Sequence, residues 1–138
     1  MTDADYTLIA DVPGEAEYRA LRLAAGLSPK TEAAARTGLP NSLFAVCVRC
    51  DSELVGMGRV VGDGGCNYEI VDVAVHPDHQ RRGLGYKVMA ALMDYIHANA
   101  PPSAYVSLIA DDWAPALYRK FGFEFTAPKS VGIALKIR

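Results

Sequence analysis

The spacing of hydrophobic and polar residues divides the chain into predicted strands and helices. Alternating or continuous apolar runs, rich in valine and isoleucine, are typical of strands. The strands predicted in this way are Tyr6–Ala10, Leu43–Arg49, Glu53–Val61, Tyr68–Val75, Ala104–Ile109, Phe123–Phe125 and Val131–Ile137. Apolar residues three and four positions apart predict helices over Glu15–Ala25, from Ser28 to Gly38, from Leu84 onward, and around Tyr118.

Capping and turn residues mark where several of these elements begin. Ser28 precedes a proline at the expected first helical position, so we expect it to cap the second helix. By the same rule Asp111 or Asp112 caps the helix around Tyr118. Asp51-Ser52 is expected to form a short hairpin turn between two strands.

The stretch from Tyr68 to Tyr86 joins a predicted buried strand to the predicted long helix. His76-Pro77 ends the strand, and Gln80-Arg81-Arg82-Gly83-Leu84-Gly85 opens the helix. The first backbone N–H groups of a helix have no partner within it, and the helix dipole adds positive charge there. Two glycines allow a ligand close to the backbone, and two arginines lie beside it. The arrangement favours a phosphate, in particular a diphosphate, over an ordinary turn with solvated arginines.

Two familiar nucleotide-binding loops do not fit this stretch. A P-loop needs lysine and then serine or threonine directly after its second glycine, whereas here Tyr86 follows Gly85 and Val88 follows Lys87. A dinucleotide-binding fingerprint needs a third glycine where Val88 stands. Both nucleotide interpretations are therefore weak.

Two sequence blocks resemble those of one acyltransferase family. The loop after Val73-Ala74-Val75-His76-Pro77 resembles motif A of the GNAT superfamily of N-acetyltransferases, whose pattern is Q/R-x-x-G-x-G/A. A second block, Ala114–Phe123 with Tyr118 inside it, is similar to the family's A-x-x-L-Y-x-K-x-G-F signature. Both blocks occur in the family's order, and the resemblance extends over residues 43–125.

The resemblance implies a fold, a cofactor and its binding residues. The fold would be α/β, of the α+β kind, with a central mixed, mostly antiparallel sheet of about six to seven strands and helices on both faces. The co-substrate would be acetyl-CoA. Its diphosphate would bind at the loop, and its pantetheine and thioester would meet backbone groups of the central strand, with amides on Val73 and Val75. The residues implied are Val73, Ala74, Val75, Gln80, Arg81, Arg82, Gly83, Leu84, Gly85 and Tyr86.

The resemblance also suggests two catalytic side chains. Tyr118 would protonate the leaving thiolate, because a phenol titrates near pH 10 and remains a proton donor at neutral pH. The alternative is a core tyrosine whose hydroxyl bonds the backbone. Glu69 would be the general base; a solvated glutamate with water as base, or Asp72 as base, are the alternatives. Strand alternation predicts that Glu69 and Asp72 lie on opposite faces of the sheet.

One residue departs from the family pattern. Asp111 stands where the family often has an asparagine seven residues before the tyrosine. An asparagine can donate a hydrogen bond to an amide carbonyl of the cofactor, whereas a carboxylate cannot. Asp111 is therefore expected to act as a helix cap.

Composition limits the remaining classes of function. The chain has 138 residues, which predicts a single domain over 1–138, with 51% hydrophobic and 22% charged residues. Its net charge of −2 gives no reason to expect nucleic acid or an anionic membrane as a partner. No apolar run is long enough to span a bilayer and no signal peptide is evident, so a cytoplasmic protein is expected.

The cysteines do not predict a metal site. Cys47 and Cys50 form a C-x-x-C pair on a predicted strand, where residues i and i+3 point to opposite faces. A structural zinc site needs four ligands, and Cys66 with the scattered histidines does not form a convincing second pair of ligands. These cysteines are expected to be core or edge residues, and no metal is expected.

The sequence therefore favours a cytoplasmic N-acetyltransferase. It would move acetyl from acetyl-CoA to a primary amine, on a small molecule or a peptide, by direct attack in a ternary complex. The alternative is a non-catalytic CoA-binding or regulatory module that keeps the phosphate loop. The sequence does not identify the acceptor amine, and the resemblance allows a homodimer.

Overall fold

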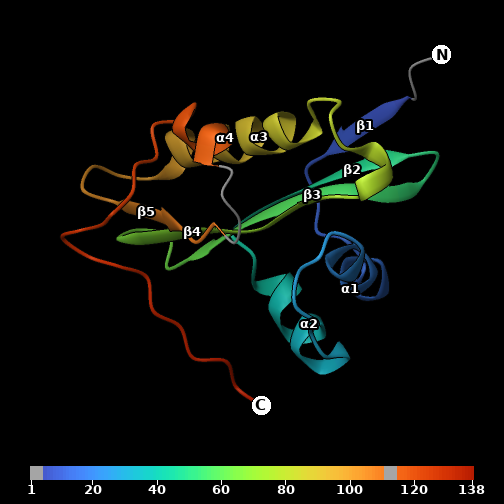
Figure 1. The fold of residues 1–138 in the computed structure, drawn as a ribbon, viewed down its shortest axis with the longest axis horizontal. Coiled ribbons are helices and arrows are strands. Elements are labelled where there is room, and N and C mark those ends of the chain that lie inside the picture. Colours follow the sequence, from blue (N-terminus) through green and yellow to red (C-terminus); the bar gives the residue numbers. More distant parts are fainter. Residues whose placement is uncertain (1–4, 111–114) are drawn as a thin grey trace. The chain divides into compact units, whose positions relative to one another are not determined.

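The computed structural model describes residues 5–110 and 115–138, and these residues form two compact units. The first unit lies within Met1–Leu108 and the second within Ile109–Arg138. The strands and the longer helices belong to the first unit, and the second contains one short helix. Figure 1 shows the course of the chain through both.

The first unit contains a five-stranded sheet whose strands follow one another in chain order. Its strands are β1 (Tyr6–Ile9), β2 (Phe44–Cys50), β3 (Glu53–Gly62), β4 (Asn67–Val75) and β5 (Tyr105–Leu108). Neighbouring strands pair antiparallel except β4 and β5, which pair parallel. The mixed, mostly antiparallel sheet is thus confirmed, and each of these strands begins and ends within a residue or two of its predicted limits.

The two hairpins form where turn residues predicted them. Asp51 and Ser52 have positive φ values of 51° and 71°, which is the backbone of the tight turns that suit the twist of a hairpin. They join Cys50 to its partner Glu53. The next hairpin is closed by Asp63, whose Oδ1 accepts hydrogen bonds from three successive backbone N–H groups.

The helices of the first unit are α1 (Glu15–Ala24), α2 (Glu32–Gly38) and α3 (Leu84–Asn99). The prediction that Ser28 caps α2 is wrong. Thr31 caps it instead, because its Oγ1 accepts from the Ala34 N–H at 3.1 Å. The Ser28 side chain has another partner, since its Oγ accepts a hydrogen bond from Arg22.

Helices cover both faces of this sheet, as predicted. Figure 1 shows α3 on one side of the sheet and α1 with α2 on the other. Tyr18 and Leu21 of α1 pack with Met57 and Ala74 of the sheet in one buried cluster. On the opposite face the apolar stripe of α3 is fully buried against β2, β3 and β4.

A glycine allows α3 to approach the sheet closely. A Cβ atom placed on Gly58 of β3 would lie 2.7 Å from Cγ1 of Val88 and 2.8 Å from Cδ1 of Leu92. Real Cβ atoms do not come this near to other carbons. The small residue at position 58 is therefore a packing requirement of the α3 interface.

The second unit contains α4 (Pro115–Arg119) and an extended C-terminal segment. The predicted closing strands Phe123–Phe125 and Val131–Ile137 are wrong, because neither segment pairs with any strand in the part of the chain that the structure describes. Ile133, Leu135 and Ile137 alternate as in a strand, yet each is at least 85% exposed. The sheet thus has five strands rather than six or seven, since alternation alone supplies no pairing partner.

No helix in the described residues is long and apolar enough to cross a membrane.

Candidate active site

Strand β4 is interrupted by a bulge at Asp72. Val71 pairs with Arg59 and Ala74 pairs with Met57, so that Asp72 and Val73 together oppose Gly58 alone. Asp72 has φ of 59°, in the left-handed region that a residue with a side chain rarely adopts. Such a two-against-one bulge bends the strand and increases its twist.

The bulge changes which side chains share a face of the sheet. Glu69 pairs with Val61 and therefore lies on the same face as Arg59, two residues along β3. Asp72 contacts that same Arg59, so Glu69 and Asp72 lie on one face. The prediction of opposite faces is wrong, because strict alternation fails where a strand carries an extra residue.

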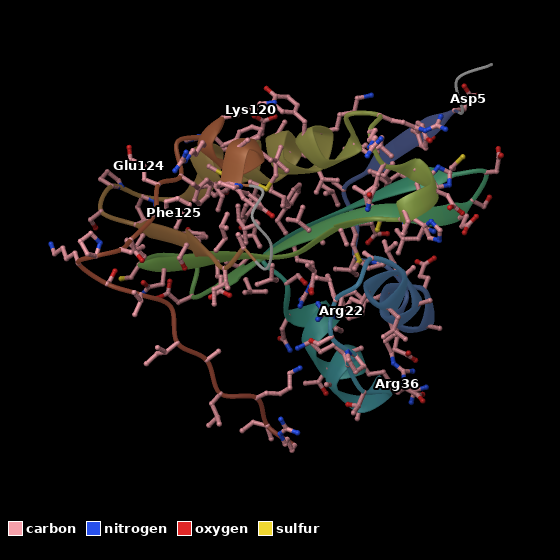
Figure 2. All side chains as sticks on the ribbon, in the orientation of Figure 1. Asp5, Arg22, Arg36, Lys120, Glu124 and Phe125 are labelled. Carbon is pink, nitrogen blue, oxygen red and sulfur yellow. The ribbon has the colours of Figure 1, made fainter. Side chains whose placement is uncertain are left out.

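The carboxylate of Asp72 is the centre of a buried polar cluster. Its Oδ2 accepts hydrogen bonds from the Tyr18 hydroxyl at 2.9 Å and from Nε of Arg59 at 2.7 Å. Its Oδ1 accepts from Nη1 of Arg22, a side chain that extends from α1 (Figure 2). The Asp72 side chain is only 5% exposed. With both oxygens bound to cations, it is poorly suited to accept a proton from an acceptor amine.

The groups around Asp72 are themselves held by further hydrogen bonds. Ser28 accepts from Arg22 through its carbonyl and its hydroxyl, and the Ser42 hydroxyl accepts from Arg59. Burial raises the pKa of the Tyr18 phenol, and the negative charge of Asp72 raises it further. Sequence reasoning missed this cluster, because its members come from distant elements and no local pattern connects them.

The backbone of β4 beyond the bulge directs donors away from β3. The N–H of His76 donates to the Val55 carbonyl of β3, so by alternation the N–H groups of Val75 and Val73 point to the opposite side. On that side β5 pairs with β4 only as far as Ile70. The proposed donors thus face the edge of β4 where the β5 register has ended.

The glycine-containing loop follows directly on this edge. The Nε2 of Gln80 donates to the Val75 carbonyl at 3.1 Å and so ties the loop to the end of β4. Arg81 and Gly83 both adopt left-handed backbone conformations, with φ of 63° and 78°. Gly83 is the N-cap of α3, which begins at Leu84 as the sequence predicted.

Several N–H groups of this loop have no acceptor among the residues that the structure describes. The first intrahelical bond runs from the Lys87 N–H to the Gly83 carbonyl. From Arg81 to Gly85 no backbone N–H donates to an atom of the described residues. Arg81 and Arg82 are exposed and form no ion pair within the same part of the chain. These donors and charges fit the predicted diphosphate.

A tyrosine from the first strand secures the segment before the loop. The short 3₁₀ helix η2 (Pro77–His79) follows β4, and a 2.9 Å hydrogen bond links Nδ1 of His79 to the Tyr6 hydroxyl of β1. Nδ1 of His76 accepts from the Asp78 N–H. Both histidines thus help to fix the segment that precedes the loop.

The two predicted catalytic side chains belong to different units. Glu69 is half-buried on β4 and forms no ion pair with a described residue. Tyr118 is half-buried on α4 of the second unit. Their catalytic roles stay predictions. Asp111 and Asp112, expected as caps of α4, lie outside the described residues.

The cysteines behave as small packing residues where they are buried. Cys47 is 1% exposed, and its Sγ donates to the Asp11 carbonyl. Burial raises the pKa of the Cys47 thiol to about 11. Cys50 and Cys66 are also free thiols. Among the described residues no group of three or more histidine, cysteine or acidic side chains is placed to hold a metal.

Known proteins resemble this chain in sequence and in structure. A family model described as "Acetyltransferase (GNAT) domain" matches residues 40–125. The "Uncharacterized N-acetyltransferase ycf52" of Porphyra purpurea is 38% identical over 72 residues, which cover 52% of this chain and 40% of the relative. The chain thus spans about two fifths of the length of the curated relatives that it matches first.

Several solved structures match nearly the whole chain, among them the following two. One is a Staphylococcus aureus protein described as of unknown function and as a probable acetyltransferase; it is 47% identical, with a TM-score of 0.93, over 96% of this chain and 100% of that chain. The other is a GNAT family acetyltransferase from Streptococcus pneumoniae, 23% identical with a TM-score of 0.74, over 97% and 98% of the two chains. The second likeness shows the fold alone.

Proposed function

Because this chain belongs to the GNAT family of acetyltransferases, we propose that it transfers the acetyl group of acetyl-CoA to a primary amine by direct attack in a ternary complex. The observation that carries the proposal is a row of backbone N–H groups that extends from the end of β4 into the loop before α3. This row runs from Val73 and Val75 on β4, past the Gln80 contact, to the open N–H groups between Arg81 and Gly85.

The loop suits the diphosphate of coenzyme A. Unpaired N–H groups at the start of a long helix attract an anion, and the helix dipole adds to that attraction. The exposed Arg81 and Arg82 supply charge that the described residues leave uncompensated. Ala74, Leu84 and Tyr86 complete the set proposed to contact the cofactor.

The proposed reaction is a single displacement at the thioester carbonyl. The amine nitrogen forms a bond to the carbonyl carbon, and the carbon–sulfur bond breaks. The proton that the amine loses goes to Glu69, directly or through water, and the departing thiolate takes a proton from Tyr118. The N–H of Val73 donates to the carbonyl oxygen as negative charge gathers there.

A titration of thermal stability with acetyl-CoA tests the binding step. A ligand that binds only the folded protein stabilises it by about 2.7 kcal/mol at one hundred times its dissociation constant. We expect the unfolding midpoint to rise with acetyl-CoA and with CoA. Replacing both Arg81 and Arg82 with alanine is expected to reduce the rise, because the diphosphate then loses two cations. No rise in the wild-type protein would contradict the proposal.

A panel of primary amines tests the transfer step. Release of free thiol from acetyl-CoA is measured for small amines, amino sugars and peptides with free N-termini. We expect at least one class to accelerate thiol release and to gain the mass of an acetyl group. Binding of acetyl-CoA without turnover of any amine would instead indicate a non-catalytic CoA-binding module.

A further inference from the structure

The β4 bulge contains a residue, Asp72, whose left-handed backbone conformation must be held by its surroundings. Asp72 has φ of 59°, a conformation that disfavours residues with side chains and that persists only where surrounding contacts impose it. Glycine would adopt this conformation without strain. The chain instead has a carboxylate at this position, and that carboxylate is almost completely buried.

The contacts that impose this conformation come from two other elements. Arg22 and Tyr18 extend from α1, Arg59 extends from β3, and all three donate to the Asp72 carboxylate. Charged hydrogen bonds of this kind are short and strongly directional. The cluster leaves no buried side-chain nitrogen or oxygen unpaired among the described residues. It therefore fixes the position of the bulge relative to α1 and β3.

The bulge lies where β4 separates from its parallel neighbour. The pairing with β5 ends at Ile70, two residues before Asp72, and Val73 is the second of the two bulge residues that oppose Gly58. Bulges bend a strand and change the direction of the groups that follow. The anchoring of Asp72 thus determines where the N–H of Val73 points.

We propose that Asp72 is a positioning residue for acetyl transfer, which through Arg22, Arg59 and Tyr18 holds the bulge that aims the Val73 N–H at the thioester carbonyl. This inference rests on the proposed acetyltransferase function. Because its carboxylate is buried and bound by Arg22, Arg59 and Tyr18, Asp72 acts through the backbone of the residue that follows it. Preorganised donors of this kind stabilise a transition state because they need no rearrangement during the reaction.

The principal variant is Asp72→Asn, which keeps the size and the tolerance of the left-handed conformation but removes the charge. We expect kcat to fall by about 10-fold or more, which is less than the loss of about 100- to 1,000-fold that follows complete removal of an oxyanion donor. The dissociation constant of CoA is expected to stay within about 2-fold, because the diphosphate loop is untouched. Amide hydrogen exchange at His76, whose N–H donates to the Val55 carbonyl of β3 just beyond the bulge, is expected to become faster.

Two further variants separate positioning from general destabilisation. Glu17→Gln weakens another carboxylate–arginine pair between α1 and the sheet, which is more exposed than the Asp72 pairs and joins Glu17 of α1 to Arg49 of β2 rather than to β4. It is expected to lower the unfolding midpoint while kcat changes by less than about 2-fold. Tyr18→Phe removes a single hydrogen bond to Asp72 and is expected to lower kcat in the same direction as Asp72→Asn, by a smaller factor. It serves as the test if Asp72→Asn does not fold.

The results that would overturn the inference differ from those that would overturn the proposed function. Suppose that the wild-type protein acetylates an amine and that Asp72→Asn and Tyr18→Phe acetylate it equally fast. The positioning role of Asp72 is then wrong, whereas the proposed acetyltransferase function still stands. If the wild-type protein turns over no amine, the exchange measurement still decides. Unchanged protection of the His76 amide in the folded variant would show that the carboxylate does not hold the bulge.

Discussion

At the scale of single residues, burial decides which titratable groups are available for chemistry. Asp72 and Glu69 are both carboxylates on β4, and strand alternation alone could not separate their roles. The structure encloses Asp72 between two guanidinium groups, whereas Glu69 remains half-buried and forms no ion pair with a described residue. Of the two carboxylates considered as bases, Glu69 is therefore the better candidate.

The role of Tyr118 is tested by removing its hydroxyl. We expect Tyr118→Phe to lower kcat by about 100-fold or more, because a positioned general acid typically contributes that much. The dissociation constant of CoA, measured by titration calorimetry, is expected to stay nearly constant. A loss of CoA affinity with unchanged kcat would mean that the hydroxyl binds the cofactor instead of protonating the thiolate.

Burial also predicts the reactivity of the thiols. The pKa of Cys47 is raised to about 11, so its thiolate is scarce at pH 8 and increases only as the pH approaches that value. We expect iodoacetamide at pH 8 to modify the exposed Cys66 in the folded protein and to leave Cys47 unmodified. Mass spectrometry of the digested protein identifies the modified residue. Equal labelling of both thiols in the folded state would contradict the buried position of Cys47.

At the scale of elements, local signals were sufficient for most helices, strands and turns. The hairpin at Asp51-Ser52 and the start of α3 at Leu84 were predicted because their turn and glycine residues act within a few positions. The start of α2 was predicted wrongly, since both Ser28 and Thr31 are good caps. Only the contact of Ser28 with Arg22 decides between them.

The packing of α3 on the sheet is tested at Gly58. The Gly58→Ala variant places a methyl group against Val88 and Leu92, and we expect it to lower the free energy of unfolding by about 1–3 kcal/mol. The matched control is Gly38→Ala, because a Cβ there meets nothing within 4 Å. Urea denaturation of both variants measures the difference. Equal stability would show that α3 shifts without cost.

At the scale of the whole molecule, the number of strands could not be obtained from the hydrophobic pattern. Val131–Ile137 alternates apolar and small or polar residues, as a strand does. A strand exists only when it pairs, and pairing depends on a distant edge being within reach. The five strands of the first unit meet this condition, whereas the C-terminal segment has no strand partner among the described residues.

Hydrogen exchange of the full-length protein tests this difference between segments. We expect the amides of Val131–Ile137 to exchange with little protection, because the structure gives them no ladder hydrogen bonds to described residues. The amides of β2, β3 and α3 are expected to be strongly protected. Strong protection across Val131–Ile137 in solution would restore the closing strand that the alternating pattern predicted.

The sequence by itself determined the features that depend on neighbouring residues. These are the hairpin turns, most helix limits, and the glycine-containing loop that precedes α3. The tertiary structure alone decided the face on which Glu69 lies, the partners of Asp72 and the number of strands. The physical reason is that an extra residue in β4 reverses the alternation, and its conformation is held by arginines that α1 and β3 bring from distant positions in the chain.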